Sequence, residues 1–277
     1  MAAMTPYLDR YMAGEYERVW DELVALGAEV REEPLYSDAL AVARETMRRV
    51  RNNIEMLIPR LDSMGYQFGY GWASGRDFPS GPPDPVFSPP PPNVAEILAE
   101  LEAGTGVLPL SLRAFYEVVG SVNVVGQPSE EWTDWRAVPD DVDALYVYPA
   151  AVALEDMETW QERYDYLRKD EWDPPGTDEE DICDARAYFA LPRDCWLVPV
   201  APDEWHKYDI SGCGAYEIAI PNLAADAHLL TERHRTTFVN YLRICFRWAG
   251  FPKLERVPGA PAAVSALLVL TRGLLPF

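Results

Sequence analysis

The chain has 277 residues, of which 48% are hydrophobic and 25% are charged, and its formal net charge at pH 7 is −21. A chain of this length and hydrophobic content can bury a sizeable core, which argues against wholesale disorder. The excess of acid argues against electrostatic binding to DNA, RNA or an anionic membrane, because phosphates require clustered Lys and Arg. We therefore expect no nucleic-acid partner and no membrane partner.

The cysteines and the apolar segments predict where the chain works. It has four scattered cysteines and no CxxC pair: Cys183, Cys195, Cys213 and Cys245. Such residues need no disulfide framework, so buried reduced thiols are expected. The first twelve residues lack a basic stretch followed by an apolar run, so no signal peptide is expected. The longest apolar stretch, residues 264–275, suits a docked helix better than a membrane span. The prediction is a cytoplasmic protein.

Charge is unevenly distributed along the chain. Residues 1–78 hold 9 basic and 13 acidic side chains, whereas residues 130–184 hold 4 basic and 19 acidic ones. Residues 185–277 hold 10 basic and 8 acidic side chains. Most of the negative charge therefore falls in one central segment, and dense charge of one sign attracts a partner of the opposite sign.

Two helices are expected at the N-terminus. The first carries an apolar stripe between Tyr16 and Leu26 and is expected to end at Gly27. In the second, Ser37 is the expected N-cap and Pro59 the expected end. Its apolar residues recur at spacings of three and four, which places them on one helix face: Leu40, Ala43, Met47, Val50, Ile54 and Leu57. A helical hairpin buries this face, and so does contact with a second copy of the chain.

Glycine and proline interrupt the chain after the second helix. Residues 65–72 combine glycines with aromatic residues, but no Gly-Lys-Ser/Thr follows, so a phosphate-binding loop is not indicated. Residues 79–92 are rich in proline, which predicts an extended, stiff linker or a strap across the surface. A docking site for a proline-binding domain is the alternative.

From residue 93 onward, short helices and short strands are interspersed. Asn93 is expected to cap one helix, and Gly120 and Gly250 to follow two others. Helices that flank several short strands define an α+β domain. The expected helices cover residues 94–101, 110–119 and 237–248, and the expected strands cover residues 122–125, 144–148, 196–200 and 216–220.

Four short sequences in this region carry a family resemblance. They are LPLSLRAFY at residues 108–116, VGSVN at 119–123, YEIAIPN at 216–222 and TFVNYLR at 237–243. Together they resemble the SUKH superfamily of Smi/Knr-type proteins, over residues 93–277. The resemblance implies an α+β fold with a single mixed, curved β-sheet and flanking helices. Bacterial members include immunity proteins that bind and neutralise toxins, and fungal members act as scaffolds. No family-wide catalytic residue is implied.

The predicted organisation thus has three parts. Residues 1–78 form an N-terminal helical hairpin region, and residues 79–92 form the proline-rich linker. Residues 93–277 form the SUKH-like α+β domain, with an acidic insertion at about residues 130–184. Both the hairpin and the insertion are additions to a minimal SUKH domain.

One run of reactive side chains suggests an enzyme. Residues 203–213 contain Asp203, His206, Ser211 and Cys213, so a carboxylate, an imidazole and a nucleophile lie close in sequence. None of them sits on a Gly-x-Ser-x-Gly elbow, and Asp, Ser and Gly are the residues that turns use. A loop joining two strands is therefore the expected structure, and no catalytic residue is predicted.

Metal binding has little support in the sequence. His228 and His234 are six residues apart, which does not place them on one helix face, and no cysteine pair accompanies them. Neither a metal nor another cofactor is expected. One acidic run could gather a hard cation, although such runs are usually solvated loops: Asp178, Glu179, Glu180 and Asp181.

The acidic segment is also the best candidate for a binding surface. Tryptophan is enriched among residues that dominate interface energies. The candidate partner-binding residues are this acidic run and the tryptophans interleaved with the acid: Trp132, Trp135, Trp160 and Trp172. The alternative is that these tryptophans fill the core of an ordinary insertion.

The sequence therefore predicts a non-enzymatic, protein-binding protein. Its most concrete form is an immunity-type protein that neutralises a basic, nuclease-like toxin by direct binding. The alternative is a self-associating scaffold, a homo-oligomer that uses the N-terminal helices. Arg44, Arg48 and Arg51 form a basic stripe on the second helix that is either solvated or docked onto an acidic segment.

Overall fold

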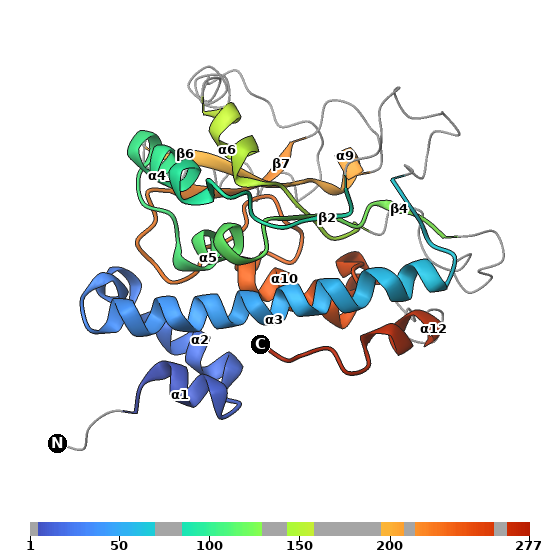
Figure 1. Ribbon diagram of the computed structural model, residues 1–277, viewed down its shortest axis with the longest axis horizontal. Coiled ribbons are helices and arrows are strands. Elements are labelled where there is room, and N and C mark those ends of the chain that lie inside the picture. The colour runs from blue at the N-terminus through green and yellow to red at the C-terminus, as the bar shows by residue number, and fades with distance from the viewer. Residues whose placement is uncertain (1–4, 70–84, 129–142, 158–194, 208–213, 258–264) are drawn as a thin grey trace.

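The computed structural model describes residues 5–69, 85–128, 143–157, 195–207, 214–257 and 265–277. A long helix, α3, runs across the molecule (Figure 1). The strands lie on one side of α3, and α1, α2 and the C-terminal segment lie on the other (Figure 1). None of the helices in the described ranges is long and apolar enough to cross a membrane.

The N-terminal region contains three α-helices and a 3₁₀ turn. They are α1 (Tyr7–Met12), α2 (Tyr16–Ala25), η1 (Gly27–Arg31) and α3 (Leu35–Ser63). The prediction that α2 stops near Gly27 is confirmed, because Gly27 has a φ of +54° and opens the 3₁₀ turn. Helix α1 was not predicted from the sequence.

Both predicted ends of the second helix are wrong. Helix α3 begins at Leu35, and Ser37 lies inside its first turn, where its hydroxyl donates to the Glu33 carboxylate at 2.8 Å. Pro59 lies inside the helix, which continues to Ser63. The last turn is held by tertiary contacts, because Leu61 is fully buried and the Arg60 guanidinium donates to two carbonyls of the C-terminal segment.

The short strands of the described residues form antiparallel pairs. β1 (Gln67–Phe68) pairs with β4 (Gly126–Gln127), β2 (Phe87–Ser88) and β5 (Tyr146–Val147) flank β3 (Ser121–Asn123), and β6 (Trp196–Pro202) pairs with β7 (Ala215–Ile220). The Tyr148 N–H donates to the Val200 carbonyl at 2.8 Å, which links the end of β5 to β6. Part of the proline-rich segment is thus a strand, β2.

The remaining helices surround these strands, so the α+β class is confirmed. Helix α4 extends beyond its predicted end, and α5 and α10 lie where they were predicted. The apolar stretch near the C-terminus forms only short helical turns. The elements are α4 (Val94–Thr105), α5 (Leu110–Val118), α6 (Ala150–Asp156), α9 (Glu204–Lys207), α10 (Phe238–Arg247), η3 (Pro252–Arg256), α12 (Ser265–Leu268) and η4 (Val269–Thr271).

Gly120 makes the turn from α5 into β3. Its φ is +93°, a conformation that L side chains rarely adopt. A Cβ on this residue would also collide with the Ser88 carbonyl at the end of β2. The glycine that the sequence marked as a helix stop therefore also leaves room for the end of the neighbouring strand.

The main hydrophobic core of the described residues includes both the N-terminal helices and the α+β region. The apolar stripe of α3 is buried apart from half-buried Leu40, and α3 packs against α5. Cys195 and Cys245 are buried free thiols, as predicted. Cys183 and Cys213 lie outside the described residues.

Candidate functional site

The predicted partner-binding residues all lie outside the described residues. They fall within 129–142 and 158–194, so their role stays a prediction. These residues are Trp132, Trp135, Trp160, Trp172, Asp178, Glu179, Glu180 and Asp181.

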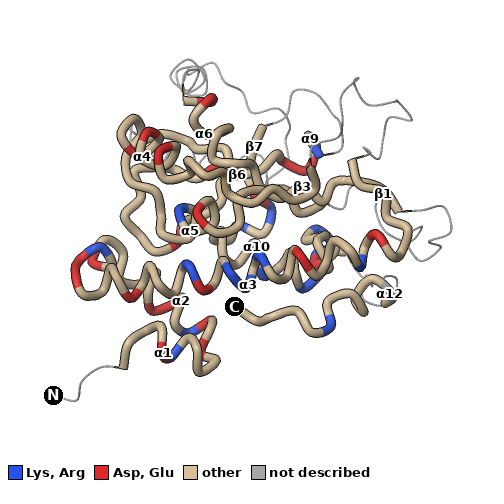
Figure 2. Tube along the Cα trace, in the orientation of Figure 1, with Lys and Arg blue, Asp and Glu red and all other residues tan. Residues whose placement is uncertain are grey.

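An acidic surface nevertheless lies on the described helices next to that segment. Glu96 and Glu100 of α4 and Glu155 of α6 are exposed, and the two helices pack against each other. Figure 2 shows acidic residues gathered on α4 and α6 at one end of the molecule. Helix α6 is followed directly in the chain by the acidic residues from 158 onward.

The basic side chains are largely used within the chain. Nearly all Lys and Arg side chains in the described ranges bond to a carboxylate or carbonyl of the same chain. In the predicted basic stripe, Arg44 pairs with Glu117 of α5 at 2.8 Å. Arg48 pairs with Glu45 at 3.1 Å, and Arg51 pairs with Glu55 at 2.9 Å. Most described cations are therefore already paired with groups of the same chain.

A buried polar cluster lies beneath α9, in the run that suggested an enzyme. Lys207 forms an ion pair with Asp143, and only 3% and 4% of these side chains are exposed. The Tyr216 hydroxyl donates to the second Asp143 oxygen at 3.1 Å. The ammonium also lies 4.9 Å from the centre of the Tyr216 ring, a favourable cation–π distance. The cluster satisfies a charge pair that would be costly to bury alone.

A second set of charges lies close to this pair. Glu204 pairs with Arg233 and, at 3.1 Å, with Lys253. His234 contacts Glu232 through Nδ1 at 2.5 Å. Burial lowers the pKa of His234, but the hydrogen bond with Glu232 and the nearby carboxylates outweigh it, so the pKa is raised from its ordinary value. The Glu232 carboxylate therefore favours the protonated form of this imidazole.

The described reactive groups of this region are buried or hydrogen-bonded within the chain. Burial raises the pKa of the Cys245 thiol well above its usual value, which makes it a poor nucleophile. The Asp203 carboxylate accepts the Gly214 N–H at 2.9 Å and so closes the connection from β6 to β7. The side chain of His206 and residues 208–213 lie outside what the structure describes. Among the described residues, no group of three or more His, Cys, Asp or Glu could hold a metal ion.

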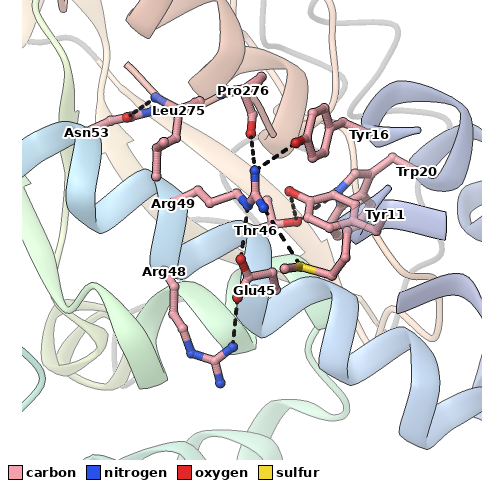
Figure 3. Close-up of polar contacts among 11 residues, drawn as sticks. Tyr11, Tyr16, Trp20, Glu45, Thr46, Arg48, Arg49, Asn53, Leu275 and Pro276 are labelled. Atoms are coloured by element: carbon pink, nitrogen blue, oxygen red, sulfur yellow. Dashed lines mark hydrogen bonds and ion pairs between the residues drawn. The ribbon is translucent and has the colours of Figure 1, made fainter. Parts of the chain in front are cut away.

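Helix α3 also presents a line of polar side chains to the C-terminal segment (Figure 3). The Asn53 side chain donates to the Leu275 carbonyl at 2.9 Å and accepts the Leu275 N–H at 2.7 Å. Arg49 donates to the Pro276 carbonyl and to the Tyr16 hydroxyl, each at 3.0 Å. Arg49 also pairs with Glu45 at 3.0 Å, so its guanidinium joins three parts of the chain.

The same line ends in a buried hydrogen-bond chain between helices. The Trp20 indole N–H donates to the Thr46 hydroxyl at 3.0 Å, and that hydroxyl donates to Tyr11 at 2.9 Å. Burial raises the pKa of Tyr11 to about 12. Sequence reasoning missed this line, although its spacing of three, four and seven is helical: Thr46, Arg49, Asn53 and Arg60.

A groove of about 400 Å³ opens beside this cluster, between α1 and α3. Its apolar part includes Met12, of which 54% is exposed. Arg48 and Glu45 line its polar side, and Figure 3 shows Arg48 turned toward Glu45. The full lining is Leu8, Met12, Ser37, Ala41, Arg44, Glu45 and Arg48.

The structure is that of an acidic α+β protein. Its described reactive side chains are engaged in buried ion pairs and in hydrogen bonds between helices. No family model, curated protein or solved structure matches the chain.

Proposed function

We propose that this protein works by binding another protein and not by catalysis. Its most concrete form is a cytoplasmic, immunity-type protein that neutralises a basic toxin by direct binding. One observation supports the proposal most directly: most described cations are paired within the chain, while Glu96, Glu100 and Glu155 stay exposed on α4 and α6. These carboxylates lie on the two packed helices α4 and α6, and α6 leads in the chain into the acidic residues from 158 onward, so they extend the negative charge available to a basic partner.

The fold part of the proposal is a SUKH-like domain with a single mixed, curved sheet. The strand order β2–β3–β5 and the backbone hydrogen bond from Tyr148 to Val200 support a single sheet, because that bond joins two of the small sheets. The acidic segment at about 130–184 includes β5 and α6 among its described residues. The candidate tryptophans of the insertion would then supply the apolar part of the interface.

The non-enzymatic part of the proposal is supported by the state of the reactive groups. Lys207 and Glu204 are both committed to buried ion pairs, and the Cys245 thiol is buried with a raised pKa. A catalytic acid, base or nucleophile has to reach a substrate, and these groups are enclosed by the chain's own side chains.

Affinity purification of the tagged protein from its own cells, at low and high salt and followed by mass spectrometry, tests the proposal. We expect one basic protein that is lost as salt rises, because salt screens attraction between surface charges. Recovery of nothing above background, or a co-encoded toxin that stays active at saturating protein, would refute it.

A charge variant then tests the surface. Glu96→Gln, Glu100→Gln and Glu155→Gln together should slow association with the recovered partner by about tenfold at low salt. A matched control removes three exposed carboxylates elsewhere, with Asp9→Asn, Glu17→Gln and Glu29→Gln. Equal slowing in both variants would mean that total charge, and not this surface, attracts the partner.

The second candidate function is a self-associating scaffold, and the groove between α1 and α3 favours it. Met12 is an exposed apolar side chain on the edge of that groove. If copies associate there, Met12→Glu lowers the sedimentation coefficient in ultracentrifugation. Leu223→Glu, at another exposed apolar residue, is the control and should leave it unchanged. A monomeric unmodified protein at micromolar concentration would exclude this function.

A further inference from the structure

The segment that follows η4 lies along α3 without forming a helix or strand (Figure 1). Leu274 of this segment is half-buried and packs against the hydrophobic core. Leu275 is 39% exposed and Pro276 is exposed, whereas only 6% of Phe277 is accessible. The Phe277 ring packs edge-on against Phe246 of α10, with 5.8 Å between ring centres. The segment is thus attached by its main chain and by the side chains of Leu274 and Phe277.

The main-chain contacts are specific in geometry. Asn53 meets both the N–H and the C=O of Leu275, the pair of groups that a neighbouring β-strand would bond. Arg49 donates to the Pro276 carbonyl at 3.0 Å, and Arg243 donates to the Phe277 carbonyl at 2.7 Å. These contacts are to backbone atoms, which every residue type has. Recognition of this kind gives affinity to extended peptides, with pockets for selected side chains giving specificity.

The groups that hold the segment match a main chain. With the segment in place Asn53 is fully buried, and a buried amide without hydrogen bonds is destabilising. The Leu275 main chain supplies both of its bonds. The arrangement therefore suits the main chain of an extended peptide.

We propose that the site formed by Asn53, Arg49, Arg243 and Phe246 is a peptide-binding groove, occupied in the structure by the chain's own residues 272–277. A partner peptide of the same chemistry displaces that segment. Its ligand class is an extended peptide with an aromatic residue two positions after the residue clamped by Asn53. This groove is separate from the acidic surface on α4 and α6, so the inference does not depend on the proposed function.

The attached segment competes with any free peptide. A short tether gives its own segment an effective concentration in the millimolar range. A free peptide of equal intrinsic affinity therefore binds the full chain far more weakly than a chain that lacks the segment. Removing residues 272–277 consequently exposes the groove to measurement.

The test uses a fluorescent synthetic peptide with the sequence of residues 271–277, TRGLLPF, and a chain that ends at Thr271. Fluorescence anisotropy should show saturable binding of the peptide to the shortened chain. Its affinity for the full chain should be at least about tenfold lower. A peptide methylated on the backbone nitrogen that corresponds to Leu275 lacks the N–H that Asn53 accepts. This methylated peptide should bind the shortened chain about tenfold more weakly than the unmodified peptide does. The unmodified peptide should lose a similar factor when the shortened chain carries Asn53→Ala.

Failure of a folded shortened chain to bind the peptide would overturn the proposal. Equal affinity of the full and shortened chains would also overturn it, because the peptide would then bind elsewhere. If the shortened chain does not fold, hydrogen exchange on the full chain gives the answer. The Leu275 amide should exchange about 100-fold faster than amides in the middle of α3, since displacement requires local release. Exchange of both only by global unfolding would refute a displaceable segment.

Discussion

The Lys207→Met substitution tests the buried cluster beneath α9. In the folded protein Lys207 pairs with Asp143, and both side chains are almost fully enclosed. Methionine matches the length of lysine and keeps the apolar packing, but it removes the positive charge. Among the described residues, Asp143 would then keep the hydrogen bond from Tyr216, at 3.1 Å. The variant therefore leaves a buried carboxylate without its counter-ion.

The expected cost follows from that burial. Removing one partner of a buried pair costs about 3–5 kcal/mol, whereas an exposed pair contributes roughly 0–1 kcal/mol. Since domains are stable by about 5–15 kcal/mol, the variant should lose a large share of its stability. The double variant Lys207→Met with Asp143→Leu removes both charges. Its free energy of unfolding should be within about 1 kcal/mol of that of the unmodified protein. The remaining loss arises because the Tyr216 hydroxyl no longer has an acceptor.

Urea unfolding followed by circular dichroism measures Lys207→Met, Asp143→Leu and the double variant against the unmodified protein. The double variant should cost far less than the sum of the two single variants, and that difference is the coupling free energy between Lys207 and Asp143. A loss below about 1 kcal/mol for Lys207→Met would place the ammonium in solvent and contradict this account of the cluster.

Three further predictions concern single residues. The Asp38 carboxylate accepts hydrogen bonds from the first two N–H groups of α1 and so caps that helix. Asp38→Ala should therefore lower the free energy of unfolding, measured in urea, by about 1 kcal/mol. An unchanged unfolding midpoint would contradict this role of Asp38. Gly120→Ala should cost about 2 kcal/mol or more because of its positive φ and the strand beside it, and a melting temperature equal to that of the unmodified protein would show that the turn adapts. His234 has a raised pKa, so its contribution to stability is complete below the unfolded value of 6.5 and is lost as pH rises through the higher folded value. His234→Gln should remove that part of the pH dependence, and identical profiles would contradict it.

Local sequence signals located most of the helices and strands. The apolar stripe at Met47, Val50 and Ile54 is buried, as its spacing predicted. Gly120 and Gly250 follow their helices with positive φ, because few other residues adopt that conformation. These features depend on neighbours a few residues apart, so the sequence displays them directly.

The ends of α3 depended on distant residues. A proline normally stops a helix, but here the turn after Pro59 is held by burial of Leu61 and by Arg60 bonding to the C-terminal segment. The proline's local effect was visible in the sequence. The contacts that outweigh it come from residues more than 200 positions away, as in the bond from Arg60 to Leu270.

By itself the sequence determined the α+β class, the concentration of acid in one segment and the burial of the apolar helix faces, because composition and periodicity control them. Only the tertiary structure decided which polar residues meet. Asp143 and Lys207 are 64 residues apart, and Asn53 and Leu275 are 222 apart, so no local pattern links either pair. Such pairs form because the fold buries both members together, and a buried polar group has to find its partner there.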